Sequence, residues 1–334
     1  MDIKGVKNGI RSRIIGTGLY VPKSVMSNSD LEKMVDTSDQ WIVERTGIRE
    51  RRIAMDGETT SFMAAKASEK ALEMANTSVE EIDIIIVATS TPDMFFPSTA
   101  CMVQNNLGAK RSFAFDISAA CSGFIYALSV SDQYIRSGFC KTALVIGSEV
   151  LSTITDWTDR TTCVIFGDGA GAVVLKKSDG ERGVLSTHLY SDAKFWDLIY
   201  VPGGGSRCPP SEKMLKDRLN SMKMKGNETF KIAVRALEEA SREALRYNDI
   251  SVSDIAFFIP HQANYRIIKA VADRLHISMD NVFINIDRYG NTSSASIPIA
   301  LDEAVRSNRI NDGDIIIISA FGGGLTWGSA AIRW

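Results

Sequence analysis

The feature that most restricts the fold of this 334-residue chain is an internal repeat at a spacing of 173 residues. The shift superimposes several separate parts of the chain: Ser78-Val79 with Ile82 on Ser251-Val252 with Ile255, the apolar runs 84–87 and 143–145 on 257–260 and 316–318, and Ala127-Leu128 on Ala300-Leu301. The identities are few, but one spacing that serves several segments indicates a duplication. We therefore expect two similar halves, residues 1–182 and 183–334.

The apolar runs within this repeat have the length of strands and show no polar alternation. Residues 84–88, 143–146 and 315–318 are continuously apolar, which is typical of parallel strands that helices cover on both faces. The sequence therefore predicts an α/β fold in which two βαβ-type halves pack with their buried helices together. In such sheets the loops that follow the strands hold the chemistry.

Composition excludes several classes of protein. The net charge of −2 gives no basic field for nucleic acid or for a membrane surface. The five cysteines are odd in number and show no Cys-x-x-Cys spacing, which argues against a zinc site and against a disulfide framework. Neither an apolar leader nor a run of membrane-spanning length is present. We expect a cytoplasmic protein with no nucleic-acid or membrane partner.

Cys121 stands where a strand-like stretch meets an apolar helix. Small residues surround it (118–123), and the apolar run 124–128 follows. Backbone N–H groups at a helix start favour a thiolate over a thiol, and small neighbours leave room for a substrate. A buried structural cysteine is the commoner alternative.

Of the three histidines, His261 has the most suggestive position. It ends a buried strand directly after Pro260, whereas His188 lies in an alternating strand and His276 ends a helix, so we interpret these two as structural. A hydrogen-bonded core histidine remains an alternative for His261, and Asn291 alone would more often form a turn. The duplication brings Cys121, His261 and Asn291 toward one centre, which favours a shared site.

A polar segment near the N-terminus offers a second candidate site. Trp41 and Arg45 are four residues apart and share one face if the segment is helical. Such an aromatic plate beside a cation suits a nucleobase and a phosphate. A surface turn with scattered charge is the alternative, and physical reasoning alone favours it.

The sequence as a whole resembles the β-ketoacyl-acyl-carrier-protein synthase III family, the initiating condensing enzymes of fatty acid synthesis. The resemblance extends from Arg13 to Trp334 and rests on these motifs: Thr37-Ser38-Asp39-x-Trp41-Ile42-x-x-Arg45-Thr46-Gly47-Ile48-x-x-Arg51-Arg52, the Cys121 segment, His261-Gln262-Ala263-Asn264, Gly290-Asn291-Thr292-Ser293 and Phe321-Gly322-Gly323-Gly324-x-Thr326-Trp327-Gly328. It implies a thiolase-like fold, in which duplicated βαβαβ halves form a five-layered αβαβα sandwich.

The same resemblance implies an activity and its catalytic residues. Cys121, His261 and Asn291 become the catalytic triad for condensing an acyl-CoA with malonyl-acyl carrier protein through an acyl-cysteine. Our candidates for the oxyanion hole are the backbone N–H groups of Cys121 and Gly323. No metal and no cofactor are expected, since the coenzyme A thioester is itself a substrate.

The resemblance also assigns binding residues and a homodimer. Coenzyme A contacts are expected at Thr37, Trp41, Arg45, Arg160, Asn227 and Phe230, with the adenine between Trp41 and Arg160. Phe96 is expected to enter the acyl pocket of the partner subunit, and Arg266 to dock the carrier protein. The stretch 202–222 is longer than in the short members of the family, so the rim of the pantetheine tunnel is the least secure assignment.

Three alternatives remain open from the sequence. A specialised relative that makes a polyketide, quinolone or ester would carry the same triad. A cysteine hydrolase would also use Cys, His and Asn, but would bring a secretion signal or pro-segment and a different chain layout. A non-catalytic carrier-binding module would not need all three side chains. The preferred acyl chain length is not fixed by the sequence, because the pocket depends on packing around Phe96 and on the partner.

Overall fold

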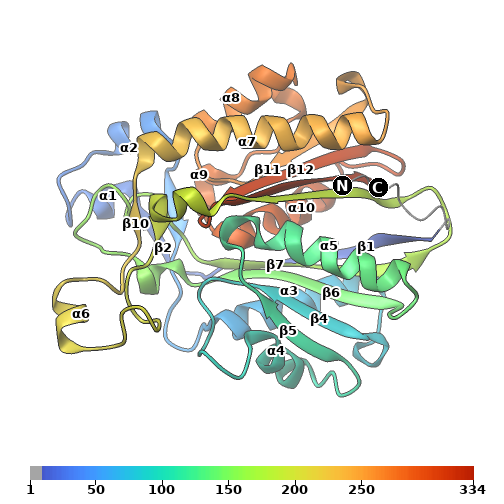
Figure 1. The fold of residues 1–334 in the computed structure, drawn as a ribbon, viewed down its shortest axis with the longest axis horizontal. Coiled ribbons are helices and arrows are strands. Elements are labelled where there is room, and N and C mark those ends of the chain that lie inside the picture. The colour runs from blue at the N-terminus through green and yellow to red at the C-terminus, as the bar shows by residue number, and fades with distance from the viewer. Residues whose placement is uncertain (1–9) are drawn as a thin grey trace.

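The computed structural model describes residues 10–334, and two mixed sheets dominate it (Figure 1). The strand order of the five-stranded sheet is β1-β7-β6-β4-β5. These strands are β1 (Arg11–Tyr20), β7 (Gly169–Ser178), β6 (Thr142–Glu149), β4 (Ile84–Ala88) and β5 (Phe113–Ile117). β4 runs parallel to both β5 and β6, as its continuous apolar sequence predicted, while β7 is antiparallel to β1 and β6.

The second sheet comes from the C-terminal half and has the order β11-β12-β13-β8. Its strands are β11 (Ile255–Pro260), β12 (Ile315–Gly322), β13 (Thr326–Arg333) and β8 (Gly183–Ser191). β11 and β12 are parallel, and β13 is antiparallel to both of its neighbours. A single parallel bridge from Phe258 to Val282 stands where the first half has β5.

The spacing of the sequence repeat recurs in the structure. The 3-10 turn Ala120–Ser122 (η2) and helix α5 (Gly123–Arg136) correspond to the turn Ser293–Ala295 (η7) and helix α10 (Ser296–Arg306). Even the backbone strain is shared, because Ala120 and Ser293 both have left-handed φ values, 46° and 49°. The boundary between residues 182 and 183 stays a prediction.

Helices and sheets alternate in five layers (Figure 1), which confirms the fold class. Helices α5 and α10 lie between the two sheets, α3 (Thr60–Ala75) and α4 (Thr99–Leu107) cover the first sheet, and α7 (Gly226–Tyr247) and α8 (Tyr265–Leu275) cover the second. The largest buried cluster joins α5 and α10 to both sheets. The central helices are therefore apolar on several sides, as a middle layer requires.

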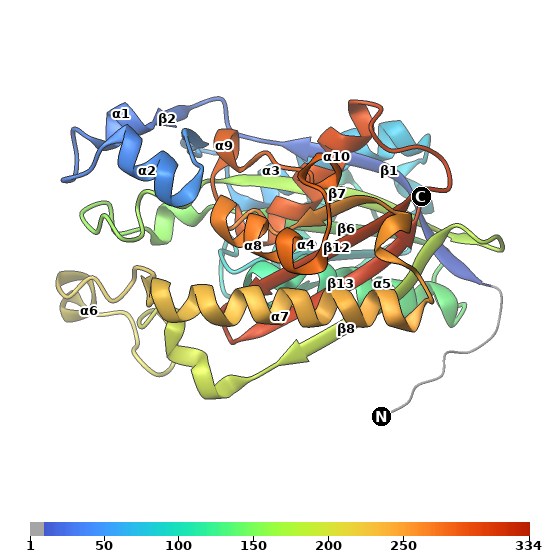
Figure 2. The ribbon, with the colours of Figure 1, turned by 90° about the horizontal axis from the view of Figure 1, so that it is seen from above.

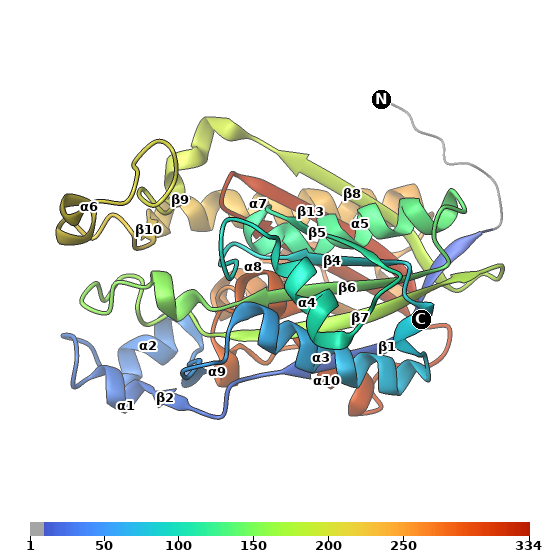
Figure 3. The same ribbon diagram turned by 90° about the horizontal axis from the view of Figure 1, so that it is seen from below.

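Short elements gather at one end of the molecule (Figures 2 and 3). They are β2 (Val25–Ser27), β3 (Glu50–Arg52), α1 (Asn28–Leu31), α2 (Asp39–Thr46), α6 (Glu212–Lys216), α9 (Ile286–Tyr289), β9 (Ile199–Tyr200) and β10 (Lys223–Met224). Further 3-10 turns are η1 (Val79–Glu81), η3 (Leu151–Ile154), η4 (Ala193–Leu198), η5 (Val252–Asp254) and η6 (Met279–Asn281). Within residues 10–334, no helix has both the length and the apolarity to cross a membrane.

Candidate active site

Cys121 lies in turn η2, immediately before α5, where the sequence placed it. Gly322 packs against it from the end of β12, since a Cβ built on Gly322 would lie 2.5 Å from the Cys121 nitrogen. The residue is partly exposed, while its thiol points into the protein. A turn with left-handed backbone at Ala120 therefore presents the sulfur to the interior.

Burial raises the pKa of the Cys121 thiol to about 12, and the charge of Glu149 adds to that rise. The Ser293 side chain, within hydrogen-bonding reach of the thiol, works in the opposite direction. The sequence led us to expect a thiolate at a helix start. The structure instead holds a protonated thiol, because loss of hydration outweighs the helix dipole at a buried sulfur.

His261 follows β11 and is fixed on two sides. The backbone N–H of His261 donates to Ser319 O at 2.8 Å, and the ring nitrogen Nδ1 lies 2.6 Å from Ser296 Oγ. Burial lowers the pKa of His261 to about 3, so the imidazole is neutral. The Ser296 oxygen also accepts a hydrogen bond from the Gln262 N–H at 3.3 Å. Its own proton is thus available to Nδ1, which leaves the imidazole proton on Nε2.

Asn291 follows Gly290, whose φ of 64° permits the turn after α9. The backbone of Asn291 is pinned in both directions, to Ile165 O at 2.9 Å and from the Gly167 N–H at 3.1 Å. Its Oδ1 accepts the Ser293 N–H at 2.8 Å. The amide oxygen is therefore occupied, and the NH₂ group is the part left to meet a substrate.

The segment 293–296 joins these three side chains. Ser293 reaches the Cys121 thiol and donates its N–H to Asn291, while Ser296 holds His261. His261 and Asn291 are also buried, with 2% and 6% of their surface exposed. The structure thus brings the sulfur, the imidazole and the carboxamide, which come from both halves of the chain, around one turn.

Gly323, a candidate oxyanion donor, directly follows Gly322 in the loop beside Cys121. A Cβ on Gly323 would lie 2.8 Å from Ile199 O, so this loop is closely covered on its other side. Larger residues at either position would displace backbone. The triple glycine in the sequence therefore marks a close approach between backbone segments.

The residues expected to bind coenzyme A lie around α2 and the starts of α7 and α8. The Trp41 ring has Arg45 and Arg160 at 5.3 and 5.2 Å from its centroid. Arg160 thus occupies the place beside Trp41 that an adenine would take, and binding would require the guanidinium to move. Among the described residues, the buried Thr37 hydroxyl has no hydrogen-bond partner, as a group that serves a ligand would.

Asn227 and Phe230 lie in the first turns of α7, and Arg266 lies at the start of α8. The Arg266 guanidinium is 5.8 Å from the centre of the Phe230 ring. The Asn264 amide donates to Arg45 O at 2.9 Å, which ties α8 to α2. The predicted coenzyme A and carrier-protein residues are therefore neighbours.

Phe96 is apart from this group. It has 84% of its surface exposed, on the loop before α4. A side chain so exposed does not line the chamber of its own subunit.

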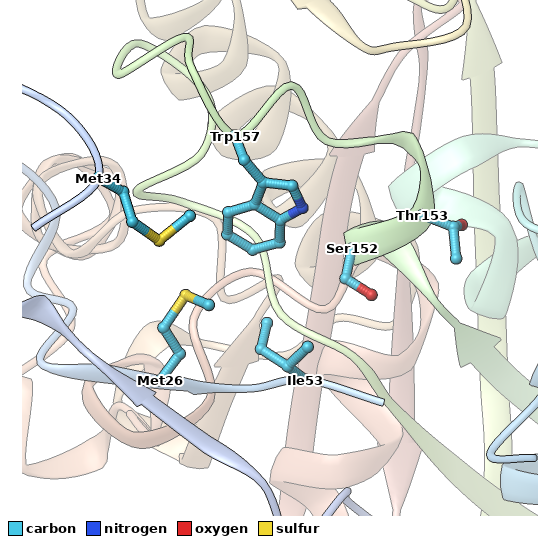
Figure 4. A pocket seen from close by; sticks show the side chains of 6 residues that line it. All are labelled: Met26, Met34, Ile53, Ser152, Thr153 and Trp157. Atoms are coloured by element: carbon cyan, nitrogen blue, oxygen red, sulfur yellow. The ribbon is translucent and has the colours of Figure 1, made fainter. Parts of the chain in front are cut away.

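A hollow of about 310 Å³ lies elsewhere, between the α1 region and η3 (Figure 4). Its walls are Met26, Met34, Ile53, Ser152, Thr153 and Trp157. None of these was a predicted site residue. The wall is mainly apolar, without converging charged groups, so the hollow is not the reaction chamber.

Sequence reasoning missed two parts of the site. Ser296 was not singled out, although its hydroxyl orients His261. Glu149, at the end of β6, was not singled out, although it is fully buried near Cys121. An acidic residue at the end of a strand that begins with the apolar run 143–146 was the available signal.

Comparisons with known proteins agree on one family. A family model described as 3-oxoacyl-[acyl-carrier-protein] synthase III matches residues 115–193, and the model of its C-terminal part matches residues 245–334. A β-ketoacyl-[acyl-carrier-protein] synthase III of Xanthomonas campestris pv. campestris is 54% identical over 97% of this chain and 99% of its own length. One of Caldanaerobacter subterraneus subsp. tengcongensis is 52% identical over 97% and 98%. The crystal structure of a 3-oxoacyl-[acyl-carrier-protein] synthase III from Aquifex aeolicus VF5 is 51% identical, with a TM-score of 0.91 over 97% of this chain and 100% of that one.

Proposed function

The chain belongs to the 3-oxoacyl-[acyl-carrier-protein] synthase III family, and from this premise we propose that Cys121, His261 and Asn291 are its catalytic residues. It is a condensing acyltransferase of fatty acid biosynthesis, which joins an acyl-CoA primer to malonyl-acyl carrier protein and loses carbon dioxide. The observation that carries the residue assignment is the segment 293–296, which contacts all three side chains.

In the first half-reaction the Cys121 sulfur bonds to the acyl carbon of the thioester. The bond between that carbon and the coenzyme A sulfur then breaks, and the thiol proton leaves with coenzyme A as its free thiol. The N–H groups of Cys121 and Gly323 stabilise the negative oxygen that develops. Because burial raises the pKa of the Cys121 thiol to about 12, the proton departs during the attack rather than before it.

In the second half-reaction the malonyl group loses carbon dioxide, and the electron pair of the broken bond becomes an enolate. His261 Nε2–H and the Asn291 NH₂ group donate hydrogen bonds to its oxygen. The pKa of His261, lowered to about 3 by burial, keeps the ring neutral, with its one N–H on Nε2 as the donor. The enolate carbon then bonds to the acyl carbon, the bond from that carbon to the Cys121 sulfur breaks, and a proton from the solvent restores the thiol.

One donor aimed at such an oxygen is typically worth about 2.7–4 kcal/mol. The reaction as written needs no cofactor, because the coenzyme A thioester is a substrate. Trp41, Arg45 and Arg160 would bind its nucleotide part, and Arg266 would bind an acidic carrier protein. The second subunit of a homodimer would supply Phe96.

The experiment that tests the assignment follows acylation by intact-protein mass spectrometry. After incubation with acetyl-CoA, the wild-type protein should gain one acyl group and Cys121→Ser should gain none. Cys101→Ser is the matched control, because Cys101 is also partly exposed but its thiol bonds Ala114 O, at 3.8 Å. Asn291→Ala should still acylate, yet condense on the order of 100-fold more slowly.

An acyl group that remains on Cys121→Ser would remove Cys121 from its role. Condensation at the wild-type rate by Asn291→Ala would show that the Asn291 carboxamide has no role in the reaction. Free acid released from acyl-CoA would instead support a hydrolase, and no adduct on the wild-type protein would support a binding module. A panel of acetyl-, isobutyryl- and medium-chain acyl-CoA substrates would then define the primer.

A further inference from the structure

Glu149 is a carboxyl group buried beside the reacting thiol, and the mechanism above does not use it. It is the last residue of β6, with none of its surface exposed. Its partners come from the loop after β4 and from turn η7, the two segments that flank the start of α5. A group in this position touches both halves of the site.

One oxygen of Glu149 receives only donors. Oε2 accepts from the Thr91 hydroxyl at 2.7 Å, the Ser90 N–H at 3.0 Å and the Thr89 hydroxyl at 3.3 Å. The Thr89 hydroxyl oxygen accepts the backbone N–H of Thr91, and the Thr91 hydroxyl oxygen accepts the backbone N–H of Val150. Each hydroxyl therefore still has its own proton to donate to Glu149. Three donors satisfy this oxygen fully.

The other oxygen faces a different situation. Oε1 lies 2.9 Å from Ser294 Oγ, and the same Oγ lies 2.8 Å from Ala88 O. A hydroxyl has one proton, whereas a carbonyl and a carboxylate only accept. Both contacts are hydrogen bonds only if Glu149 supplies the second proton. The chain then runs from Oε1–H to Ser294, and from Ser294 to Ala88 O.

Two further observations agree with a neutral carboxyl group. Burial is the main cause that raises the pKa of Glu149. The Ser293 side chain is within hydrogen-bonding reach of both Glu149 and the Cys121 thiol. An ionised carboxylate there would oppose every negative charge that develops on the sulfur.

We propose that Glu149 is held as a neutral carboxylic acid and positions the turn Ser293-Ser294, and through it the Cys121 thiol and the Asn291 carboxamide. Its proton bonds Ser294 to the loop after β4, and the Ser293 N–H in turn fixes Asn291 Oδ1 at 2.8 Å. Glu149 is a positioning residue, because it reaches the reacting atoms only through serine. Its role in turnover rests on the proposed function, whereas its protonation does not.

The first test compares three substitutions at this position. In Glu149→Gln the amide oxygen can accept from Thr91 and Ser90, and the NH₂ group can donate to Ser294, so condensation should stay within about threefold of wild type. Glu149→Leu leaves those donors without an acceptor and should condense at least about tenfold more slowly. Glu149→Asp, one methylene shorter, should fall between the two. A Gln variant as slow as the Leu variant would overturn the proposal, because an ionised carboxylate would then be required.

The second test reads the proton directly by infrared difference spectroscopy at pH 7. The wild-type spectrum should contain a protonated-carboxyl C=O band that shifts in D₂O and is absent from Glu149→Gln. Asp302→Asn is the matched control. That carboxylate is equally buried but bonds Arg306 at 2.9 Å, so the substitution should remove only carboxylate bands.

A difference spectrum for Glu149→Gln that shows loss of a carboxylate, and no acid band, would overturn the proposal. Failure of the proposed function gives a different result. The wild-type protein would then form no acyl adduct, while the infrared band of Glu149 would remain.

Discussion

Burial decides the charge of each reacting side chain before a substrate arrives. Loss of hydration keeps Cys121 as a thiol, with a pKa of about 12, and His261 as a neutral imidazole, with a pKa of about 3. Both groups therefore avoid charge because burial removes the hydration that a charge requires. Charge appears only with the substrate, first on the thioester oxygen and then on the enolate. Neutral donors that are already oriented suit that sequence of events.

The depressed pKa of His261 predicts how stability depends on pH. Above about pH 6.5 the imidazole is neutral in both the folded and the unfolded state, so it does not change the free energy of unfolding. As the pH falls from 6.5 toward 3, the unfolded state binds a proton that the folded state refuses, and the free energy of unfolding decreases. At pH 5 this loss should be about 2 kcal/mol, given a folded pKa of about 3.

The measurement is urea unfolding at pH 7.5 and pH 5 for the wild type and His261→Asn. The carboxamide oxygen of asparagine can take the place of Nδ1 beside Ser296, but it does not titrate. The wild type should lose more stability than the variant between the two pH values. Equal losses would mean that the imidazole is not buried in its neutral form.

The sequence predicted where the chemistry stands better than it predicted the state of each group. His188 lies in β8, and His276 ends α8, as their patterns indicated. The prediction that Cys121 is a thiolate was wrong, because a sequence shows where a helix starts but not how deeply the sulfur is buried. Arg51 shows the same limit. It belongs to a segment that physical reasoning favoured as a surface turn, yet it is fully buried. Among residues 10–334 its guanidinium bonds only neutral oxygens, those of Met26, Asn28 and Val164.

At the scale of elements, two related turns meet at the site. Gly123 at the start of α5 faces turn η7, since a Cβ on Gly123 would lie 3.6 Å from Ser294 Cβ. The repeat in the sequence predicted that the buried helices of the two halves would pack together. It did not predict that the second sheet would replace a fifth strand by the single bridge at Val282. That difference depends on how far the chain stays extended after the equivalent helix. The few residues that are identical between the two halves do not specify this length.

The close approach between β12 and η2 predicts that adding one methyl group at Gly322 will slow the reaction of Cys121. A Cβ on Gly322 would lie 2.5 Å from the Cys121 nitrogen and 3.2 Å from its Cα, and both atoms are backbone. Gly322→Ala must therefore displace the turn that carries the nucleophile. We expect acylation by acetyl-CoA to slow on the order of 100-fold, the usual consequence of a misplaced reacting group.

Gly205→Ala is the matched control, because a Cβ there meets no atom within 4 Å and its φ is not left-handed. Stopped-time mass spectrometry would measure the acylation rate of both variants, and circular dichroism would confirm that both are folded. Wild-type acylation by Gly322→Ala would show that the turn can shift without moving the sulfur from its productive place.

At the scale of the whole molecule, the edge strand β5 and the residues beside it expose aromatic side chains. β5 ends the order of the five-stranded sheet, so its outer side has no strand partner among the described residues. Phe113 on this strand contacts Phe139 and Tyr134, with ring centres 5.9 and 5.7 Å apart, and 72% of the Phe139 surface is exposed. Such an edge is a ready template for pairing with another chain.

These exposed groups support the proposed homodimer, which predicts a measurable change in mass. Phe113→Asp places a charge on the edge strand, where a second subunit would have to bury it, and should convert a dimer to a monomer at micromolar concentration in sedimentation velocity. Leu215→Asp is the control, because Leu215 is 59% exposed but lies on α6, away from β5. If the edge mediates assembly, acyl transfer that depends on Phe96 from the partner should weaken together with the dimer. A wild-type protein that sediments as a monomer, or a Phe113→Asp variant that stays dimeric, would show that β5 is not the contact.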